Sequence, residues 1–161
     1  MRVVRSFTVI GMNNPKSDDP THSLTTQPPG CTGHRLWQMA RARTGIEEAD
    51  WLRMTDRRNL CAGEWNREEA WHKAREWYPE LRDRTTVLLG ADVSQQFPLS
   101  MGGILTWGRE IGTPPAPARP WILIPHPSGM NRWYNDAGNR TAVEVLLADL
   151  VEMCVERDAV N

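Results

Sequence analysis

Residues 122–136 read ILIPHPSGMNRWYND, an apolar run that changes abruptly into a loop of polar side chains. The run 122–124 predicts a buried strand, and Pro125 and Pro127 end it because a proline has no N–H to give to a sheet. The loop then carries an imidazole, a hydroxyl, an amide and a guanidinium, from His126, Ser128, Asn131 and Arg132. Because ligands of open α/β sheets bind at the carboxyl ends of the strands, we expect a binding site here.

A second strand followed by polar residues lies near the N-terminus. The run from Phe7 to Ile10 is apolar or β-branched and predicts a short strand. The segment Gly-Met-Asn-Asn-Pro, residues 11–15, then predicts a turn that exposes two amides. Such a turn is often purely structural, but together with the loop after residue 124 it favours a shared site at one sheet edge.

Predicted strands alternate with predicted helices along the chain. The strands lie near 5–11, 55–61, 86–90 and 122–124, and the helices near 34–44, 46–54, 66–81 and 138–157. Residues 104–107 are a candidate for a further short edge strand. Alternation of this kind is typical of a parallel sheet covered on both faces. We therefore expect a single α/β domain over residues 1–161, built as a three-layer α/β/α sandwich around a short, mostly parallel four-stranded sheet.

Local signals mark the helices. Gly45 is expected to end the first of them, and Asn66 with Glu69 forms a capping-box pattern at the start of the third. The spacing of the apolar residues predicts a stripe facing the sheet, made by Ala70, Ala74, Trp77 and Leu81. Burial is also the expectation for the large rings of Trp37, Trp71, Trp77 and Trp121.

Composition limits the classes of function. The chain has 161 residues, 40% of them hydrophobic and 24% charged, and no apolar run near the roughly 20 residues that span a bilayer. We expect a cytoplasmic monomer without a membrane partner. The three cysteines are far apart and form no C-x-x-C pair, so neither a disulfide framework nor a zinc site is indicated, and we expect no metal or cofactor. With a net charge of −1, any nucleic-acid-binding surface must be local.

Four ordered motifs make the chain similar to the uracil-DNA glycosylase superfamily. The segments 11–15 and 126–129 resemble its Gly-x-Asn-Pro and His-Pro-Ser motifs. RNLCAGEW, residues 58–65, resembles its second strand with an Asn, and TVLLGADVSQQF, residues 86–97, its third strand and following helix. The resemblance spans nearly the whole chain and is closest to the mismatch-specific and single-strand-selective branches, which have Asn in the first motif. It implies a DNA glycosylase that acts on uracil, or a related or modified pyrimidine, flipped out of single- or double-stranded DNA.

The resemblance also implies roles for individual residues. Hydrolysis of an N-glycosidic bond needs a group that stabilises the departing base anion and a group that holds a water molecule. The first role falls to His126 as a neutral imidazole, and the second to Asn13, whose amide orients water but cannot take a proton. Asn59 would read the base edge with one donor and one acceptor. The remaining base-binding residues would be Gly11, Met12, Asn14 and Pro15.

DNA engagement is expected from the tip of the loop at 126–132. A base inside a duplex must be flipped out, and Met130 is suited to fill the gap as an apolar wedge. The neighbouring residues expected to contact DNA are Ser128, Gly129, Asn131 and Arg132. An enzyme that also cleaves the strand needs an amine nucleophile, and the chain has only two lysines, at 16 and 73. A monofunctional enzyme that uses water is therefore favoured.

The first motif departs from the family pattern by one residue. Because Asn14 stands between Asn13 and Pro15, the two amides compete for the water-positioning role. Asp18, Asp19 and His22 in the following loop are candidates for a general base. Two other functions stay open: an enzyme of the same fold that acts on a hypermodified base in DNA modification, and a nucleic-acid-binding protein that has kept the fold but lost turnover.

Overall fold

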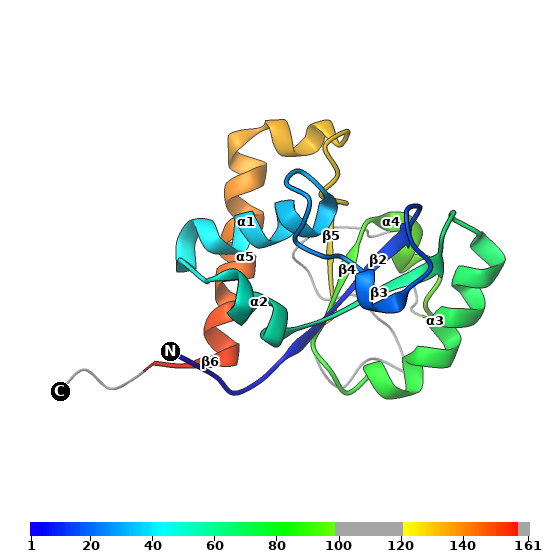
Figure 1. Cartoon of the computed structure of the whole chain (residues 1–161), viewed down its shortest axis with the longest axis horizontal. Coiled ribbons are helices and arrows are strands. Elements are labelled where there is room, and N and C mark those ends of the chain that lie inside the picture. The colour runs from blue at the N-terminus through cyan, green and yellow to red at the C-terminus, as the bar shows by residue number, and fades with distance from the viewer. Residues whose placement is uncertain (99–120, 158–161) are drawn as a thin grey trace.

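A four-stranded parallel sheet is the centre of the computed structural model, which describes residues 1–98 and 121–157 (Figure 1). Its order is β3-β2-β4-β5, with bounds β2 (Phe7–Asn14), β3 (Thr55–Ala62), β4 (Thr86–Leu89) and β5 (Trp121–Ile124). One face is covered by α1 (Thr32–Thr44), α2 (Glu48–Met54) and α5 (Ala137–Cys154). The other face is covered by α3 (Arg67–Leu81) and α4 (Ala91–Ser94). The expected three-layer α/β/α sandwich is confirmed.

Each face of the sheet has its own hydrophobic core. Side chains alternate along a strand, so Phe7 and Val9 pack toward α1, α2 and α5, whereas Ile10 packs toward α3 and α4. All four residues of β4 and of β5 are buried, because helices cover both faces of these strands. The apolar runs in the sequence reflect this double burial.

The helix ends follow the predicted signals. Gly45 adopts a left-handed φ of 67° after α1, and its N–H donates to the Arg41 carbonyl at 2.8 Å. Asn66 Oδ1 accepts a hydrogen bond from the Glu69 N–H at 2.9 Å at the start of α3. The Glu69 carboxylate bonds the Ala62 N–H at 3.1 Å, so it ties the helix to the end of β3.

Two predictions about α3 are wrong. The buried stripe contains Tyr78 in place of Trp77, because the helix is rotated so that Tyr78 packs edge-on against Trp121 with ring centroids 5.4 Å apart. Trp71 is 43% exposed, and the Arg75 guanidinium lies 3.6 Å from its ring centroid. A cation–π contact at the surface thus replaces burial for this ring. The predictions of burial for Trp37 and Trp121 are confirmed.

Strand β2 is longer than predicted. Residues 11–14 continue the strand, with Asn13 beside Cys61 and Asn14 beside Ala62 in the parallel ladder with β3. The predicted turn after residue 10 is therefore wrong, because pairing with β3 keeps this segment extended. The chain turns only at Pro15, and 104–107 lie outside the described residues.

The two ends of the described chain meet in a separate small sheet. β1 (Arg2–Val3) pairs antiparallel with β6 (Val155–Glu156), which follows α5 directly. This pairing ends the last helix at Cys154, three residues earlier than the prediction.

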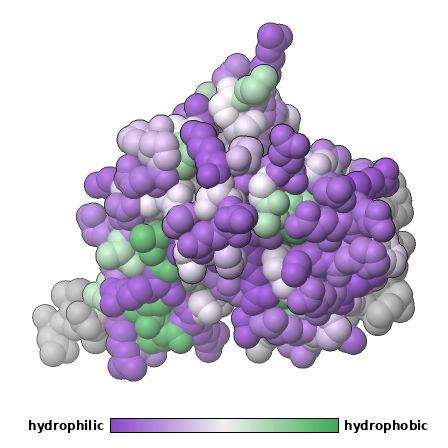
Figure 2. Space-filling view, turned by 45° about the vertical axis from the view of Figure 1, so that its right-hand side comes forward, coloured by the Kyte–Doolittle hydropathy of each residue, from purple (hydrophilic) through white to green (hydrophobic). Residues whose placement is uncertain are grey.

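Hydrophilic residues dominate the visible surface, and apolar ones gather mainly at its lower left (Figure 2). Across the parts of the chain described above, no helix is long and apolar enough to cross a membrane.

Candidate functional site

The carboxyl ends of the four parallel strands lie at one edge of the sheet, and three cavities open around the loops that leave it. We name them by the side chains that characterise them: the amide cavity, the histidine cavity and the arginine cavity. The loops are 15–31 after β2, 63–66 after β3 and 125–131 after β5. The predicted site residues belong to these loops or to the carboxyl-terminal halves of β2 and β3, except Arg132, which begins the short helix after the last loop, so the structure gathers them at this edge.

The amide cavity, of about 520 Å³, has Asn13, Asn14, Pro15 and Asn59 in its lining. Asn13 Nδ2 donates to the Gly63 carbonyl at 2.8 Å. This bond fixes the amide plane between the ends of β2 and β3. The side-chain oxygen of Asn13, Oδ1, makes no hydrogen bond to any residue that the structure describes. This oxygen is therefore available as an acceptor for a ligand or a water.

Asn59 lies opposite Gly11 in the ladder between β2 and β3. Its Oδ1 is buried and has no hydrogen-bond donor among the described residues. A Cβ on Gly11 would lie 2.6 Å from this oxygen, so only glycine leaves room for the amide. A buried acceptor without a donor costs about 1–3 kcal/mol, and such atoms in native proteins call for an explanation.

Leu24 packs at the same point. Its methyl carbons would lie 3.1 and 3.4 Å from a Cβ on Gly11, beside Asn59 Oδ1. The residue has a left-handed φ of 50°, a conformation that is strained for a leucine. The loop at 15–31 therefore holds an apolar side chain over the buried amide at some cost in backbone energy.

The rest of this loop is fixed by α1. Gly33 is required there, because a Cβ would lie 2.3 Å from the carbonyl oxygens of both Leu24 and Thr25. The His34 ring Nδ1 donates to the Thr26 carbonyl at 2.9 Å, and Cys31 Sγ bonds the Thr25 carbonyl at 3.2 Å. Close backbone contact and these bonds place the loop over the end of β2.

Both ends of the Asn14 amide bond the backbone of the first part of the loop. Its Oδ1 accepts from the Lys16 N–H at 3.1 Å, and its Nδ2 donates to the His22 carbonyl at 3.3 Å. His22 lines the amide cavity, with its Nδ1 2.8 Å from Ser17 Oγ. Asp18 and Asp19 are exposed and do not line the cavity. Of the three candidate general bases, His22 alone folds back to it.

The histidine cavity, of about 440 Å³, places His126 beside Met12, Asp92 and Trp133. Gly90 lets the loop approach closely, since a Cβ there would lie 3.2 Å from the His126 Cβ. Burial lowers the pKa of His126 below the ordinary histidine value, and the Asp92 carboxylate opposes part of that shift. The imidazole is therefore neutral at neutral pH, as the predicted role requires.

The loop after β5 divides its polar residues between structure and surface. Asn131 Nδ2 donates to the His126 carbonyl at 2.9 Å, and its Oδ1 accepts from the Trp133 N–H at 3.1 Å. Its amide is thus used within the loop, ahead of the short 3₁₀ helix η2 (Arg132–Asn135). Met130 is 93% exposed at the tip, and Arg132 is exposed and lines none of the three cavities.

Ser128 lines the arginine cavity, of about 260 Å³, between the loop and two helices. The other polar side chains in its lining are His34, Arg35, Gln38, Tyr134 and Arg140. Tyr134 Oη donates to the Pro125 carbonyl at 2.5 Å, and burial raises the pKa of this phenol. Arg35 and Arg140 are not predicted from the sequence, because these positions of α1 and α5 are distant in sequence from the motif they face.

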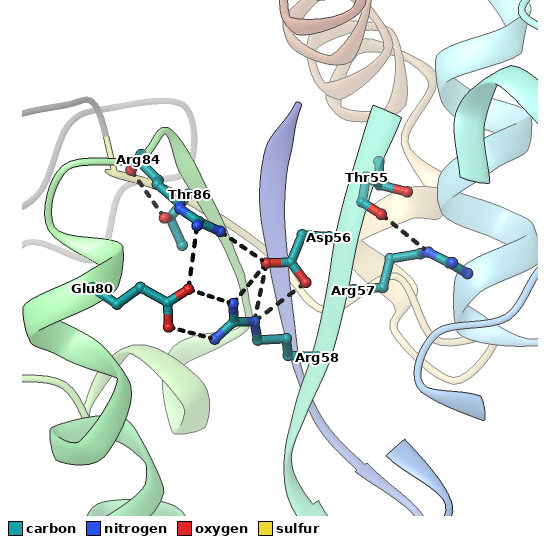
Figure 3. Close-up of polar contacts among 7 residues, drawn as sticks. All are labelled: Thr55, Asp56, Arg57, Arg58, Glu80, Arg84 and Thr86. Atoms are coloured by element: carbon teal, nitrogen blue, oxygen red, sulfur yellow. Dashed lines mark hydrogen bonds and ion pairs between the residues drawn. The ribbon is translucent and has the colours of Figure 1, made fainter. Parts of the chain in front are cut away.

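Charged residues on β3 are divided between its two sides (Figure 3). Arg58 bonds Asp56 at 2.8 Å and Glu80 of α3 at 3.0 Å, and Arg84 joins both carboxylates. Arg57 points to the opposite side, two positions before Asn59, and has no ion pair among the described residues. Burial lowers the pKa of Arg57, with Asp56 opposing the shift. The network on one side stabilises the edge strand, whereas on the other side Arg57 Nε donates to the Thr55 carbonyl at 3.5 Å.

The bond between Asn13 and Gly63 gives a test of this geometry. In Asn13→Asp the new carboxylate faces the Gly63 carbonyl and can donate only when protonated, so folding raises its pKa. Stability is then lost as pH rises through that pKa, and we expect a deficit of about 1–3 kcal/mol at about pH 7 that shrinks toward about pH 4. Urea unfolding of the variant and the wild type at each pH measures this difference in the free energy of unfolding. Asn135→Asp, at an exposed position, controls for added charge, and an equal deficit at both pH values would contradict the bond.

The predicted site residues therefore fall into separate groups at one edge. Asn13, Asn14, Pro15 and Asn59 share the amide cavity, while Met12, His126 and Asn131 share the histidine cavity. In the described segments, no three His, Cys, Asp or Glu side chains are placed to hold a metal ion. No protein-family model matches the chain, and a search of curated proteins finds no match. The glycosylase resemblance rests on the four sequence motifs alone.

Proposed function

We propose that the chain is a monofunctional DNA glycosylase that hydrolyses the N-glycosidic bond of uracil or a related pyrimidine. It would act as a cytoplasmic monomer on DNA, without metal or cofactor. The observation that carries the proposal is the pair of amides, Asn13 and Asn59, in one cavity at the carboxyl edge of a parallel sheet. Ligands of such sheets bind at this edge, which agrees with a base entering the amide cavity.

Asn59 supplies the complement of a pyrimidine edge. Its buried Oδ1 lacks a donor among the residues that the structure describes. The N3–H of uracil or thymine is a donor next to the O4 acceptor, which an amide N–H can bond. Cytosine presents an amino group and an unprotonated N3, so it would leave this oxygen without the same donor. The Leu24 side chain beside Oδ1 would have to move aside as the base enters.

His126 and Asn13 supply the chemistry. The neutral imidazole donates a ring N–H to the base oxygen as negative charge develops on the leaving pyrimidine, an oxyanion-type stabilisation. The free acceptor of Asn13 orients the attacking water. Since an amide takes no proton, His22, which lines the same cavity, is the candidate acceptor.

A nucleic-acid-binding protein without turnover is the second candidate. It is favoured by the placement of His126 and Asn13 in different cavities and by the bond that already engages the Asn13 amide. Incubation with uracil-containing single- and double-stranded oligonucleotides, followed by hot alkali, separates the candidates. Strand breaks at uracil support the proposal, breaks only in DNA with modified pyrimidines indicate a modification enzyme, and binding without breaks supports the second candidate.

Met130→Ala tests the wedge role of the exposed loop tip. Only a duplex needs a side chain to fill the gap left by the flipped base, so we expect about 10-fold slower excision from duplex DNA and little change on single strands. Single-turnover rates on both substrates measure this. Met153→Ala, at an exposed methionine in α5, is the matched control. Equal losses on the two substrates would remove Met130 from this role.

A further inference from the structure

We infer that the arginine cavity binds a phosphate group of a nucleic-acid strand, held by Arg35 of α1 and Arg140 of α5 together with Ser128. This assigns the phosphate contact to two helices in place of the exposed Arg132. The inference rests on the proposed function only for the identity of the strand as DNA. The anion-binding chemistry follows from the cavity itself.

Each of the two guanidinium groups is anchored through its own Nε atom. Arg35 Nε donates to the Gly30 carbonyl at 3.0 Å, and Arg140 Nε donates to Glu144 Oε1 at 3.1 Å. Their terminal nitrogens make no hydrogen bond to any residue that the structure describes. An arginine anchored in this way presents its two terminal N–H₂ groups, which match the oxygens of a phosphate.

The charge of the cavity favours an anion. No carboxylate is among the described residues that line it, and Ser128 adds a hydroxyl donor. The first turn of α1, with His34 and Arg35, also points the positive end of a 13-residue helix toward this region. Glu144 neutralises part of the charge of Arg140, whereas Arg35 has no ion pair within 1–98 and 121–157. Arg35 should therefore contribute more to binding.

The position of the cavity favours a phosphodiester over a free anion. Gly30 lines both the arginine cavity and the amide cavity, so the two adjoin. The Arg35 guanidinium also packs on Gly129, where a Cβ would lie 2.9 Å from its Nη2. Gly129 precedes Met130, the exposed tip of the loop. A strand whose base enters the amide cavity would have a neighbouring phosphate beside Arg35.

Binding of a short fluorescein-labelled oligonucleotide without uracil, measured by anisotropy across a salt series, tests the inference. We expect Arg35→Gln to weaken binding about 10-fold and to lower the slope of log K against log salt by about one, as the loss of one phosphate contact does. Arg140→Gln should cause a smaller loss, and Arg35→Lys should lose less than Arg35→Gln. Arg43→Gln, an exposed position later in α1, is the matched control.

Titration with inorganic phosphate and pyrophosphate, followed by calorimetry, distinguishes a site for the phosphodiester of a nucleic-acid strand from a site for a free phosphate anion. Oligonucleotide affinity that falls in Arg35→Gln but not in Arg43→Gln supports the inference, even if no base is ever excised. Unchanged oligonucleotide affinity in folded Arg35→Gln and Arg140→Gln overturns it, and phosphate binding lost in the same variants would then identify a free-anion site. Thermal unfolding confirms that each variant is folded. Uracil excision without any effect of Arg35→Gln would leave the proposed function standing and remove only this inference.

Discussion

His126→Ala is expected to slow single-turnover excision of uracil by on the order of 10²-fold, the usual cost of losing one oxyanion-type donor. Among the described residues that line the histidine cavity, the imidazole and the indole of Trp133 are the ring nitrogen donors, and burial lowers the pKa of His126. A neutral ring can donate one N–H to the base oxygen as negative charge develops on the leaving pyrimidine. The loss should appear in the chemical step and not in DNA affinity.

The controls for His126→Ala separate chemistry from folding. The His126 side chain belongs to a loop and lies outside both hydrophobic cores, so the urea midpoint of the variant should change little. His72→Ala, at an exposed position on α3, should excise at the wild-type rate. An unchanged rate in folded His126→Ala would exclude this residue from the mechanism and favour the binding protein without turnover.

Asn13→Ala should slow the same step by about 10²-fold, because a water displaced by about 1 Å from its attacking position loses that much. The free Asn13 oxygen is the acceptor that would hold this water, and the bond to Gly63 keeps it in place. Asn14→Ala should change the rate only a few-fold, since both ends of the Asn14 amide bond the loop backbone. The structure thus favours Asn13 over its neighbour for this role.

Two further outcomes would change the assignment. Loss of excision in Asn14→Ala with normal rates in Asn13→Ala would mean that the extra residue shifts the motif by one position. A loss in His22→Gln comparable to that in Asn13→Ala would identify His22 as the proton acceptor. The variant proteins should be compared at equal folded fraction, because Asn13→Ala also removes the bond to Gly63.

Local signals predicted the elements of the fold well. Apolar runs gave β4 and β5, and caps at Asn66 and Gly45 gave helix ends, because these features depend on neighbours within a few residues. Predictions failed where distant packing decides. The rotation of α3 that buries Tyr78 depends on Trp121, and the extension of β2 to Asn14 depends on the ladder with β3.

The candidate site shows the same division. Its motif residues could be placed at the carboxyl edge from sequence, since the ends of parallel strands meet there. The path of residues 15–31 could not, because it is set by Gly33 and His34 in the following helix. Nothing in the local sequence around Arg35 or Arg140 indicates a cavity shared with Ser128, as that contact needs α1 and α5 to pack side by side.

The sequence by itself determined the α/β class, the order of the strands and helices along the chain, and the chemical groups available at the strand ends. Hydrophobic periodicity and capping are local signals, because each depends on residues within a few positions along the chain. Tertiary structure alone decided which of those groups share a cavity: Asn13 with Asn59, His126 with Asp92, and Ser128 with Arg35. The physical reason is that such neighbours are set by β-strand pairing and helix packing between segments far apart in the sequence.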